Sequence, residues 1–311
     1  MPHRFTEEQD GFAVVGLRTE RAALRVCPEL GMRVLSFDDL GSGHGRGRRW
    51  LWSPPEDRRP GPQLFNNRRG DAFEDSPLVG MDECLPGVAG CDHCPDHGEV
   101  WTRPARLIDD ADDVIRTRVG LPGCGLDLDR SVTLCEGTAR FEYRLTNPGR
   151  EPRAFLYAAH PLLRILPGDR LELPPGVQRV RTGDGTGVTG FTPHATAPWP
   201  KLTPLADAAA LRLSASGPAA VKLYVDGFTD GTSALVNDDT GDRLTFRHDV
   251  ARLPALGVWI SRGGWNGYHQ VALEPTTAPL ETRTEAMHAP GPHTTVPPGE
   301  TLSWWWSMTT G

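Results

Sequence analysis

The segment TLSWWWSM, residues 301–308, places three tryptophans side by side near the end of the chain. It has the length and composition of a β-strand, and successive side chains of a strand point to opposite faces. Trp304 and Trp306 would therefore share one face, and Trp305 would occupy the other. Because both faces would carry large aromatic side chains, the segment predicts packing on both sides, as in a stack of two sheets.

Short apolar segments of the same kind recur along the chain, separated by Gly, Pro and Asp residues that favour turns. Few windows have a helical period, and even PLADAAALRLSAS (204–216) is a weak candidate. The pattern predicts an all-β fold, a sandwich or a barrel. The clearest strand candidates are FAVVGL (12–17), MRVLSF (32–37), RFEYRLTN (140–147), AVKLYV (220–225) and HQVALE (269–274).

The chain is expected to form one large domain, residues 1–311. Three Pro-rich segments, residues 53–63, 193–204 and 275–298, are too short to be interdomain linkers, and the sequence shows no internal repeat. We expect these segments to be ordered surface loops, some of them at the border of a site.

Charge and hydropathy argue against several classes of partner. The formal net charge is −7, and the basic segments RGRRW (46–50) and NNRRG (66–70) are too short to indicate nucleic-acid binding. No apolar run has the length of a membrane span, and the N-terminal MPHRFTEEQD lacks the apolar region of a signal peptide. We expect a soluble cytoplasmic protein, a monomer or homodimer, without nucleic-acid or membrane partners.

The six cysteines are, in such a compartment, more often free thiols or ligands than disulfides. Cys84, Cys91 and Cys94, with His93 or His97 beside them, have spacings that a zinc site could use. The second half of a zinc ribbon is missing, however. We therefore expect no metal and interpret the cysteines as small buried side chains in a crowded loop, with structural zinc as the alternative.

Three residues are candidates for proton transfer. His97 comes just before GEVWTRPARL (98–107), which has the composition of a strand, and His160 ends the apolar segment RAFLYAAH. Glu274 closes an apolar strand before a proline, where a buried charge is costly unless it is paired or functional. Each could instead be structural: the histidines as satisfied core or rim residues, and Glu274 as the partner of an arginine.

Aromatic residues precede Glu274. Trp259, Trp265 and Tyr268 surround SRGGWNGYHQ (261–270). Aromatic rings beside a carboxylate can stack on the apolar face of a sugar, although filling of the core is the alternative interpretation.

Taken in order, DHGEVWTRP (96–104), YAAHPLL (157–163) and VALEPTTAP (271–279) resemble motifs of the aldose 1-epimerase (galactose mutarotase-like) superfamily. ELGMRVLSFDDL (29–40) resembles the opening strands of that family, and PPGETLSWWWSM (297–308) resembles its closing strand. The resemblance thus covers about residues 12–309. It implies a large antiparallel β-sandwich that acts on a sugar or sugar-like small molecule without a cofactor.

The resemblance also implies a mechanism. Glu274 would act as general base on the C1 hydroxyl, His160 as general acid on the ring oxygen, and His97 would stabilise developing charge. The expected substrate contacts are Arg69, Arg103, Asp226, Trp259, Trp265 and Glu83.

The residues at His160, HPLL, depart from the motif of galactose mutarotases. The segment GMDECLPGVAG (80–90) resembles uncharacterised epimerase-like branches better than galactose mutarotases. Two alternatives therefore stay open. One is a biosynthetic isomerase, cyclase or lyase that uses the same His/His/Glu pocket on another substrate. The other is a non-catalytic carbohydrate-binding protein.

Overall fold

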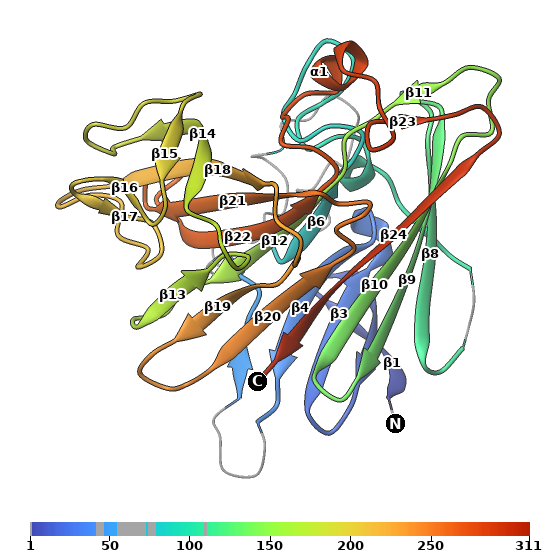
Figure 1. The fold of residues 1–311 in the computed structure, drawn as a ribbon. Coiled ribbons are helices and arrows are strands. Elements are labelled where there is room, and N and C mark those ends of the chain that lie inside the picture. Colours follow the sequence, from blue (N-terminus) through green and yellow to red (C-terminus); the bar gives the residue numbers. More distant parts are fainter. Residues whose placement is uncertain (1, 42–46, 55–72, 74–78, 109–110) are drawn as a thin grey trace.

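The structure is a computed structural model that describes residues 2–41, 47–54, 73, 79–108 and 111–311 (Figure 1). Arg69, one of the expected substrate contacts, lies outside these residues. In the part of the chain that is described, no helix is both long enough and apolar enough to cross a membrane.

Two large antiparallel sheets face each other (Figure 1). The first has the order β1-β2-β3-β4-β6-β12-β22-β21-β18-β14-β15, with β5 paired to β4. Its strands are β1 (His3–Gln9), β2 (Phe12–Arg18), β3 (Ala22–Cys27), β4 (Arg33–Asp39), β5 (Arg48–Arg49), β6 (Met81–Cys84), β12 (Ala158–Arg164), β14 (Arg179–Thr186), β15 (Thr196–Pro198), β18 (Ala219–Asp226), β21 (Ala255–Arg262) and β22 (His269–Thr276).

The second sheet has the order β13-β19-β20-β24-β10-β9-β8-β7. Its strands are β7 (Arg106–Leu107), β8 (Val114–Leu121), β9 (Leu126–Cys135), β10 (Thr138–Thr146), β13 (Asp169–Glu172), β19 (Ser233–Asn237), β20 (Arg243–His248) and β24 (Thr301–Thr310). Two short pairs complete the strands: β11 (Arg153–Ala154) with β23 (Thr295–Val296), and β16 (Lys201–Thr203) with β17 (Ala206–Asp207). The all-β sandwich predicted from the sequence is confirmed.

The tryptophan segment forms the middle of β24, between β10 and β20. Trp304 and Trp306 are buried on the face toward the first sheet, and Trp306 stacks on Phe141 with the ring centroids 4.3 Å apart. Trp305 lies on the other face, where the guanidinium of Arg140 covers its ring at 4.2 Å. The alternation is as predicted, but the outer face is covered by an arginine side chain and not by a further layer.

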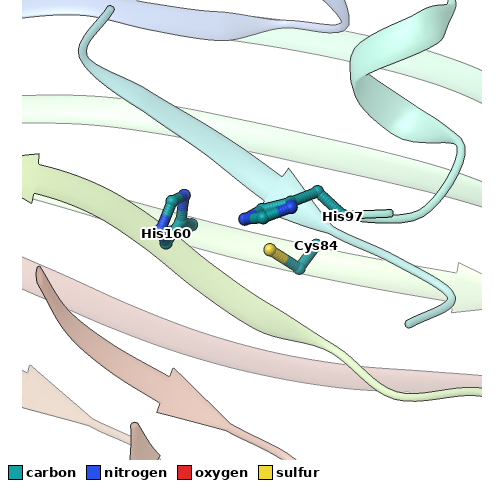
Figure 2. Close-up of side chains that lie close together, drawn as sticks. All are labelled: Cys84, His97 and His160. Carbon is teal, nitrogen blue, oxygen red and sulfur yellow. The ribbon is translucent and has the colours of Figure 1, made fainter. Parts of the chain in front are cut away.

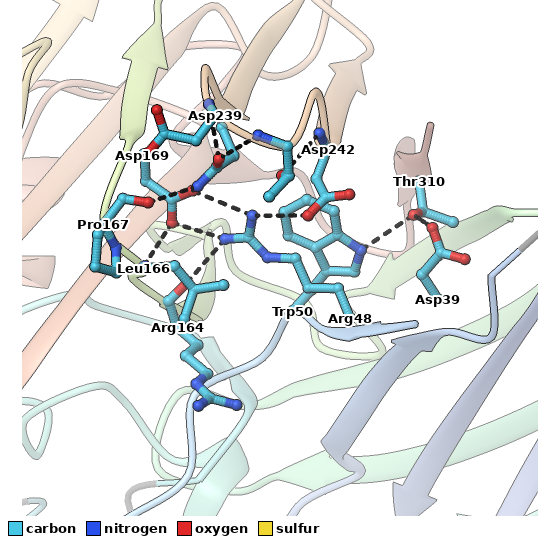
Figure 3. Close-up of polar contacts among 12 residues, drawn as sticks. Asp39, Arg48, Trp50, Arg164, Leu166, Pro167, Asp169, Asp239, Asp242 and Thr310 are labelled. Carbon is cyan, nitrogen blue, oxygen red and sulfur yellow. Dashed lines mark hydrogen bonds and ion pairs between the residues drawn. The ribbon is translucent and has the colours of Figure 1, made fainter. Parts of the chain in front are cut away.

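Polar side chains also join the two sheets (Figure 3). Arg48 of β5 makes two hydrogen bonds to the carboxylate of Asp169 in β13, at 2.7 and 3.1 Å, and its guanidinium lies 4.0 Å from the Trp50 ring centroid. Trp50 Nε1 donates to Thr310 Oγ1 at 3.1 Å. Because both members of the ion pair are buried and two hydrogen bonds join them, the pair favours a single arrangement of the sheets.

Helices are few and short in the described part of the chain. They are η1 (Pro28–Leu30), η4 (Val100–Thr102) and α1 (Arg283–His288). α1 lies within segment 275–298, which was expected to be a loop; Thr282 and Glu285 form a capping box that begins it. The weak helix candidate at 204–216 is not a helix and contains β17.

Candidate active site

A cavity of about 340 Å³ opens on the face of the first sheet that points away from the second. On β12, β18 and β22 most odd-numbered side chains, among them Leu163 and Leu273, belong to the core between the sheets. The even-numbered side chains must then point to the opposite face. Among the lining residues are Phe73, Asp96, His97, His160, Lys222, Tyr224, Trp259, Trp265, Gln270 and Glu281.

Strand register brings His160 and Glu274 together. β12 and β22 pair Ala158 with Thr276 and Leu162 with Ala272, so the same register sets His160 level with Glu274. His160 Nε2 lies 3.9 Å from Glu274 Oε1. Two residues that are far apart in the sequence thus lie close together, and His160 is one of the residues that line the cavity.

A hydrogen bond to Asp82 orients the imidazole ring of His160. The two residues face each other across β6 and β12, and His160 Nδ1 lies 3.0 Å from Asp82 Oδ1. Burial would raise the pKa of Asp82, but the charges of His160 and Arg33 outweigh it and lower that pKa below its usual range. An ionised carboxylate can only accept a hydrogen bond, so Nδ1 donates and Nε2 is directed toward Glu274.

Glu274 is 1% exposed, and its two oxygens have different surroundings. Oε2 forms an ion pair with Lys222 Nζ. Oε1 has no hydrogen-bond partner among the described residues and faces His160. Pairing with an arginine was the structural alternative for Glu274; a lysine takes that place and leaves one oxygen available.

A tight turn, and not a strand, positions His97. His97 and Gly98 both have positive φ, 57° and 78°, and a Cβ on Gly98 would lie 2.1 Å from the Leu85 carbonyl oxygen. Only glycine therefore fits after His97. The prediction that a strand begins here was wrong, because the turn leads into η4. The His97 ring stacks on Phe73 at 3.6 Å, and its centroid is 4.8 Å from that of His160.

Aromatic rings form one wall of the cavity. Trp259 and Trp265 both line it, with ring centroids 6.4 Å apart in an edge-to-face arrangement. Tyr268 packs against Trp265 at 5.8 Å, and Trp52 packs against Tyr268 at 4.7 Å. The expected aromatic surface beside Glu274 is therefore present, and Trp259 and Trp265 present it to the cavity.

Glu83 does not reach the cavity, which corrects our expectation. It follows Asp82 on β6, so it points to the opposite face, into the core. Its carboxylate accepts hydrogen bonds from Arg130 at 2.8 Å, Tyr143 at 2.8 Å and Tyr157 at 2.9 Å. Glu83 therefore joins the two sheets and cannot contact a substrate.

Two further expected contacts lie away from the cavity lining. Arg103 Nε is 3.6 Å from the Glu99 carboxylate, just after η4. Asp226 shares the face of Lys222 and Tyr224, but it is the exposed last residue of β18. Neither residue is brought to His160 and Glu274, so both expectations are corrected.

The cysteines of the alternative zinc site do not form one group of possible ligands in the described structure. Cys91 and Cys94 bond to each other through their backbones at 2.8 and 3.0 Å, within the loop. Cys84 instead lies beside His97 and His160, which line the cavity. Burial, with the charges of Asp82 and Glu274 acting in the same direction, raises the pKa of the Cys84 thiol well above its ordinary value. All six cysteines are free.

Sequence reasoning missed several residues of the site. Asp82 and Lys222 are the most important, and Phe73, Tyr224, Gln270 and Glu281 also line the cavity. A signal for Lys222 was present: it is one of two lysines in a chain with 33 basic residues, and it interrupts the apolar strand AVKLYV. A cation that replaces an apolar residue in such a strand needs a buried partner.

No protein-family model and no curated protein matches the sequence. Solved structures do match. A galactose mutarotase-like protein from Clostridium acetobutylicum superposes with a TM-score of 0.68 at 13% identity, over 99% of this chain and 98% of that one. A protein described as a "putative aldose 1-epimerase" from Klebsiella pneumoniae gives 0.67 at 15% identity, over 98% and 81%.

A third structure is similar over nearly its whole length. A galactose mutarotase related enzyme from Lactobacillus acidophilus gives a TM-score of 0.65 at 13% identity, over 99% of this chain and 97% of that one. Many structural neighbours carry such names. At this level of identity the likeness shows the fold, which is the galactose mutarotase-like β-sandwich predicted from the sequence.

Proposed function

We propose that the protein is an aldose 1-epimerase-like isomerase that interconverts the anomers of a sugar, or of a sugar-like cyclic hemiacetal. The observation that carries this proposal is the buried Oε1 of Glu274, which has no partner in the described structure and lies 3.9 Å from His160 Nε2. The C1 hydroxyl and the ring oxygen are bonded to the same carbon. An acid and a base that act on them must therefore lie close together on one side of the substrate.

Glu274 Oε1 takes the proton from the C1 hydroxyl, while protonated His160 gives the proton on Nε2 to the ring oxygen. The C1–O bond of the ring breaks, and C1 becomes an aldehyde carbon. Rotation about the C1–C2 bond then presents either face to the ring hydroxyl. On closure that hydroxyl returns its proton to His160, and the new C1 hydroxyl receives the proton from Glu274.

The surrounding residues support each step. The ionised Asp82 stabilises the protonated imidazole of His160 through Nδ1. His97, stacked on Phe73, is held where its ring can hydrogen-bond to a substrate oxygen. Trp259 and Trp265 offer apolar surface for the face of a sugar ring.

The test is the rate of α/β equilibration of free aldoses, followed by NMR or polarimetry. Glu274→Gln keeps the shape of the side chain but removes the base. We expect it to lower kcat by about 10²–10⁴-fold while the unfolding temperature changes little. Glu151→Gln, at an exposed position outside the cavity lining, is the control and should keep the wild-type activity. Near wild-type turnover by Glu274→Gln would refute the proposal.

Lys222 favours one second candidate, an isomerase or lyase that removes a proton from a carbon next to a carbonyl. Its ammonium, paired to Glu274 in the cavity wall, could stabilise the negative charge that develops on the carbonyl oxygen. Absence of mutarotation across hexoses, with deuterium exchange at such a carbon, would support this candidate. Sugar binding that survives loss of His97, His160 and Glu274, without turnover, would instead indicate the carbohydrate-binding protein.

A further inference from the structure

Three potential metal ligands lie close together, and two of them line the cavity (Figure 2). They are the sulfur of Cys84 and one ring nitrogen each from His97 and His160, and these atoms all lie within 4.8 Å of one another. They come from β6, from the turn before η4 and from β12, so three separate elements bring them together. Cys84 and His160 are buried, and His97 is partly exposed to the cavity.

The chemistry of this set suits a thiophilic cation. Zinc binds thiolate and imidazole at roughly 2.0–2.3 Å, which puts tetrahedral ligands about 3.3–3.8 Å apart, so movements of about an ångström would close the set around an ion. The softness of the sulfur disfavours Mg²⁺ and Ca²⁺, which prefer oxygen.

Two independent contacts support such a site. Asp82 accepts the Nδ1–H of His160 at 3.0 Å, and metal-ligating histidines are commonly oriented by a carboxylate in this way. Glu274 Oε1, nine-tenths buried or more and without a partner in the described part of the chain, lies 3.9 Å from His160 Nε2. It could accept a hydrogen bond from a water on the ion.

We propose that Cys84, His97 and His160 form a binding site for Zn²⁺ or another thiophilic divalent cation, with the fourth coordination position open to the cavity. Three protein ligands and an open position are the arrangement of zinc sites that take an exchangeable ligand, whereas structural sites are closed by four protein ligands. The neutral thiol of Cys84 must release its proton on binding, so the affinity should fall as the pH is lowered.

Metal binding and the acid–base reaction would compete for the same nitrogen of His160. Zinc on His160 Nε2 occupies the position that carries the transferred proton in the proposed mechanism. If the protein is a mutarotase, added Zn²⁺ should therefore lower its rate in proportion to site occupancy. This consequence rests on the proposed function, whereas metal binding itself does not.

The test measures binding directly. The full chain is stripped with a chelator, incubated with Zn²⁺ and passed through gel filtration, and the zinc retained per chain is determined by elemental analysis. Co²⁺ is then substituted for Zn²⁺, because a thiolate ligand gives a sulfur-to-cobalt charge-transfer band. We expect near-stoichiometric zinc in the wild type and a charge-transfer band with Co²⁺.

Cysteine variants locate the ion. Cys84→Ser should weaken zinc binding by more than about 100-fold, because even loss of an orienting partner costs roughly 10–100-fold. Cys124→Ser, at another buried free thiol, is the matched control and should bind like the wild type. Thermal unfolding of each variant shows whether it has folded.

No retained zinc in the wild type, or unchanged binding by folded Cys84→Ser, would overturn the proposal. Zinc lost in Cys91→Ser but kept in Cys84→Ser would place the ion in the loop and also contradict it. Failure of mutarotation leaves all of these measurements intact, so the proposed function and the metal site can fail separately.

Discussion

Glu274 has two carboxylate oxygens with different tasks. Oε2 is held by Lys222, while Oε1 faces His160. A carboxylate that is 1% exposed is costly to keep ionised unless a cation lies beside it. Lys222 therefore acts through Glu274 and is a positioning residue: it holds Oε2 and leaves Oε1 as the oxygen that faces His160.

Replacing Lys222 by Met should lower kcat more than it changes KM. Without the ammonium, Oε2 of Glu274 loses its partner and the carboxylate is no longer fixed with Oε1 toward His160. A shift of about 1 Å can cost roughly 100-fold in rate. The measurement is kcat and KM for the wild type and Lys222→Met, with the unfolding temperature as the check on folding.

The chain offers a matched control in its other lysine. Lys201 pairs with Asp207 at the surface, 2.9 Å away, with its side chain 61% exposed. Lys201→Met should leave kcat and KM unchanged. A wild-type kcat in folded Lys222→Met would show that Lys222 does not position Glu274.

At the scale of elements, the pairing of β21 with β22 shapes the site. The register sets Gly257 opposite Glu274. A Cβ on Gly257 would lie 2.6 Å from Glu274 Oε2 and 3.2 Å from its Cβ. The glycine thus leaves the space that the carboxylate occupies on the cavity face of the sheet.

Gly257→Ala should damage catalysis more than folding. The added methyl group must displace the carboxylate, and a shift of about 1 Å can cost roughly 100-fold in rate. Gly120→Ala on β8 is the control, since its Cβ would meet only Asp127 Oδ1, at 3.3 Å, far from the cavity. Turnover and unfolding temperature are measured together; full activity of Gly257→Ala would contradict this role of the register.

Strand alternation is the part of the site that could be predicted from the sequence. It indicated that Trp304 and Trp306 share a face. That His160 and Glu274 belong to one site was implied by the family resemblance and not by alternation. Alternation failed at β6, because MDEC carries a carboxylate toward each face. Asp82 points toward His160 and Glu83 into the core, and nothing local shows which face of a strand meets the core when both faces carry a carboxylate.

The order of the strands in the sheet sets the other limit on what could be predicted from the sequence. β6, β12, β22, β21 and β18 are neighbours in the sheet but come from residues 81–276. Such pairings cannot be read from local patterns, so Lys222 was not connected with Glu274. The turn at His97 was missed for a related reason: GEVW has strand composition, but the close approach of Gly98 to Leu85 forces a turn.

At the scale of the whole molecule, stability should depend on the protonation of His248 in β20. The side chain is buried against Phe228, and neither ring nitrogen has a hydrogen-bond partner in the described structure. Burial lowers the pKa of His248 from 6.5 to about 4, although the charge of Asp230 acts the other way. The folded protein therefore holds this imidazole neutral where the unfolded chain protonates it.

The direction in which stability changes with pH follows from proton linkage. Above pH 6.5 the residue is neutral in both states, so it makes no difference to the pH dependence. As the pH falls from 6.5 to about 4, only the unfolded chain gains a proton at this site, and the folded state loses stability. The loss should approach about 3 kcal/mol, since each pKa unit corresponds to about 1.4 kcal/mol.

His248→Leu removes this titration, so the free energy of unfolding should fall less steeply with acid than in the wild type. The comparison is made by urea denaturation between pH 7 and 4, because groups common to both proteins then cancel. His269→Gln, at an exposed histidine that begins β22, should keep the wild-type slope. Parallel curves for the wild type and His248→Leu would mean that the folded protein admits the proton without cost, for instance by letting water reach the ring.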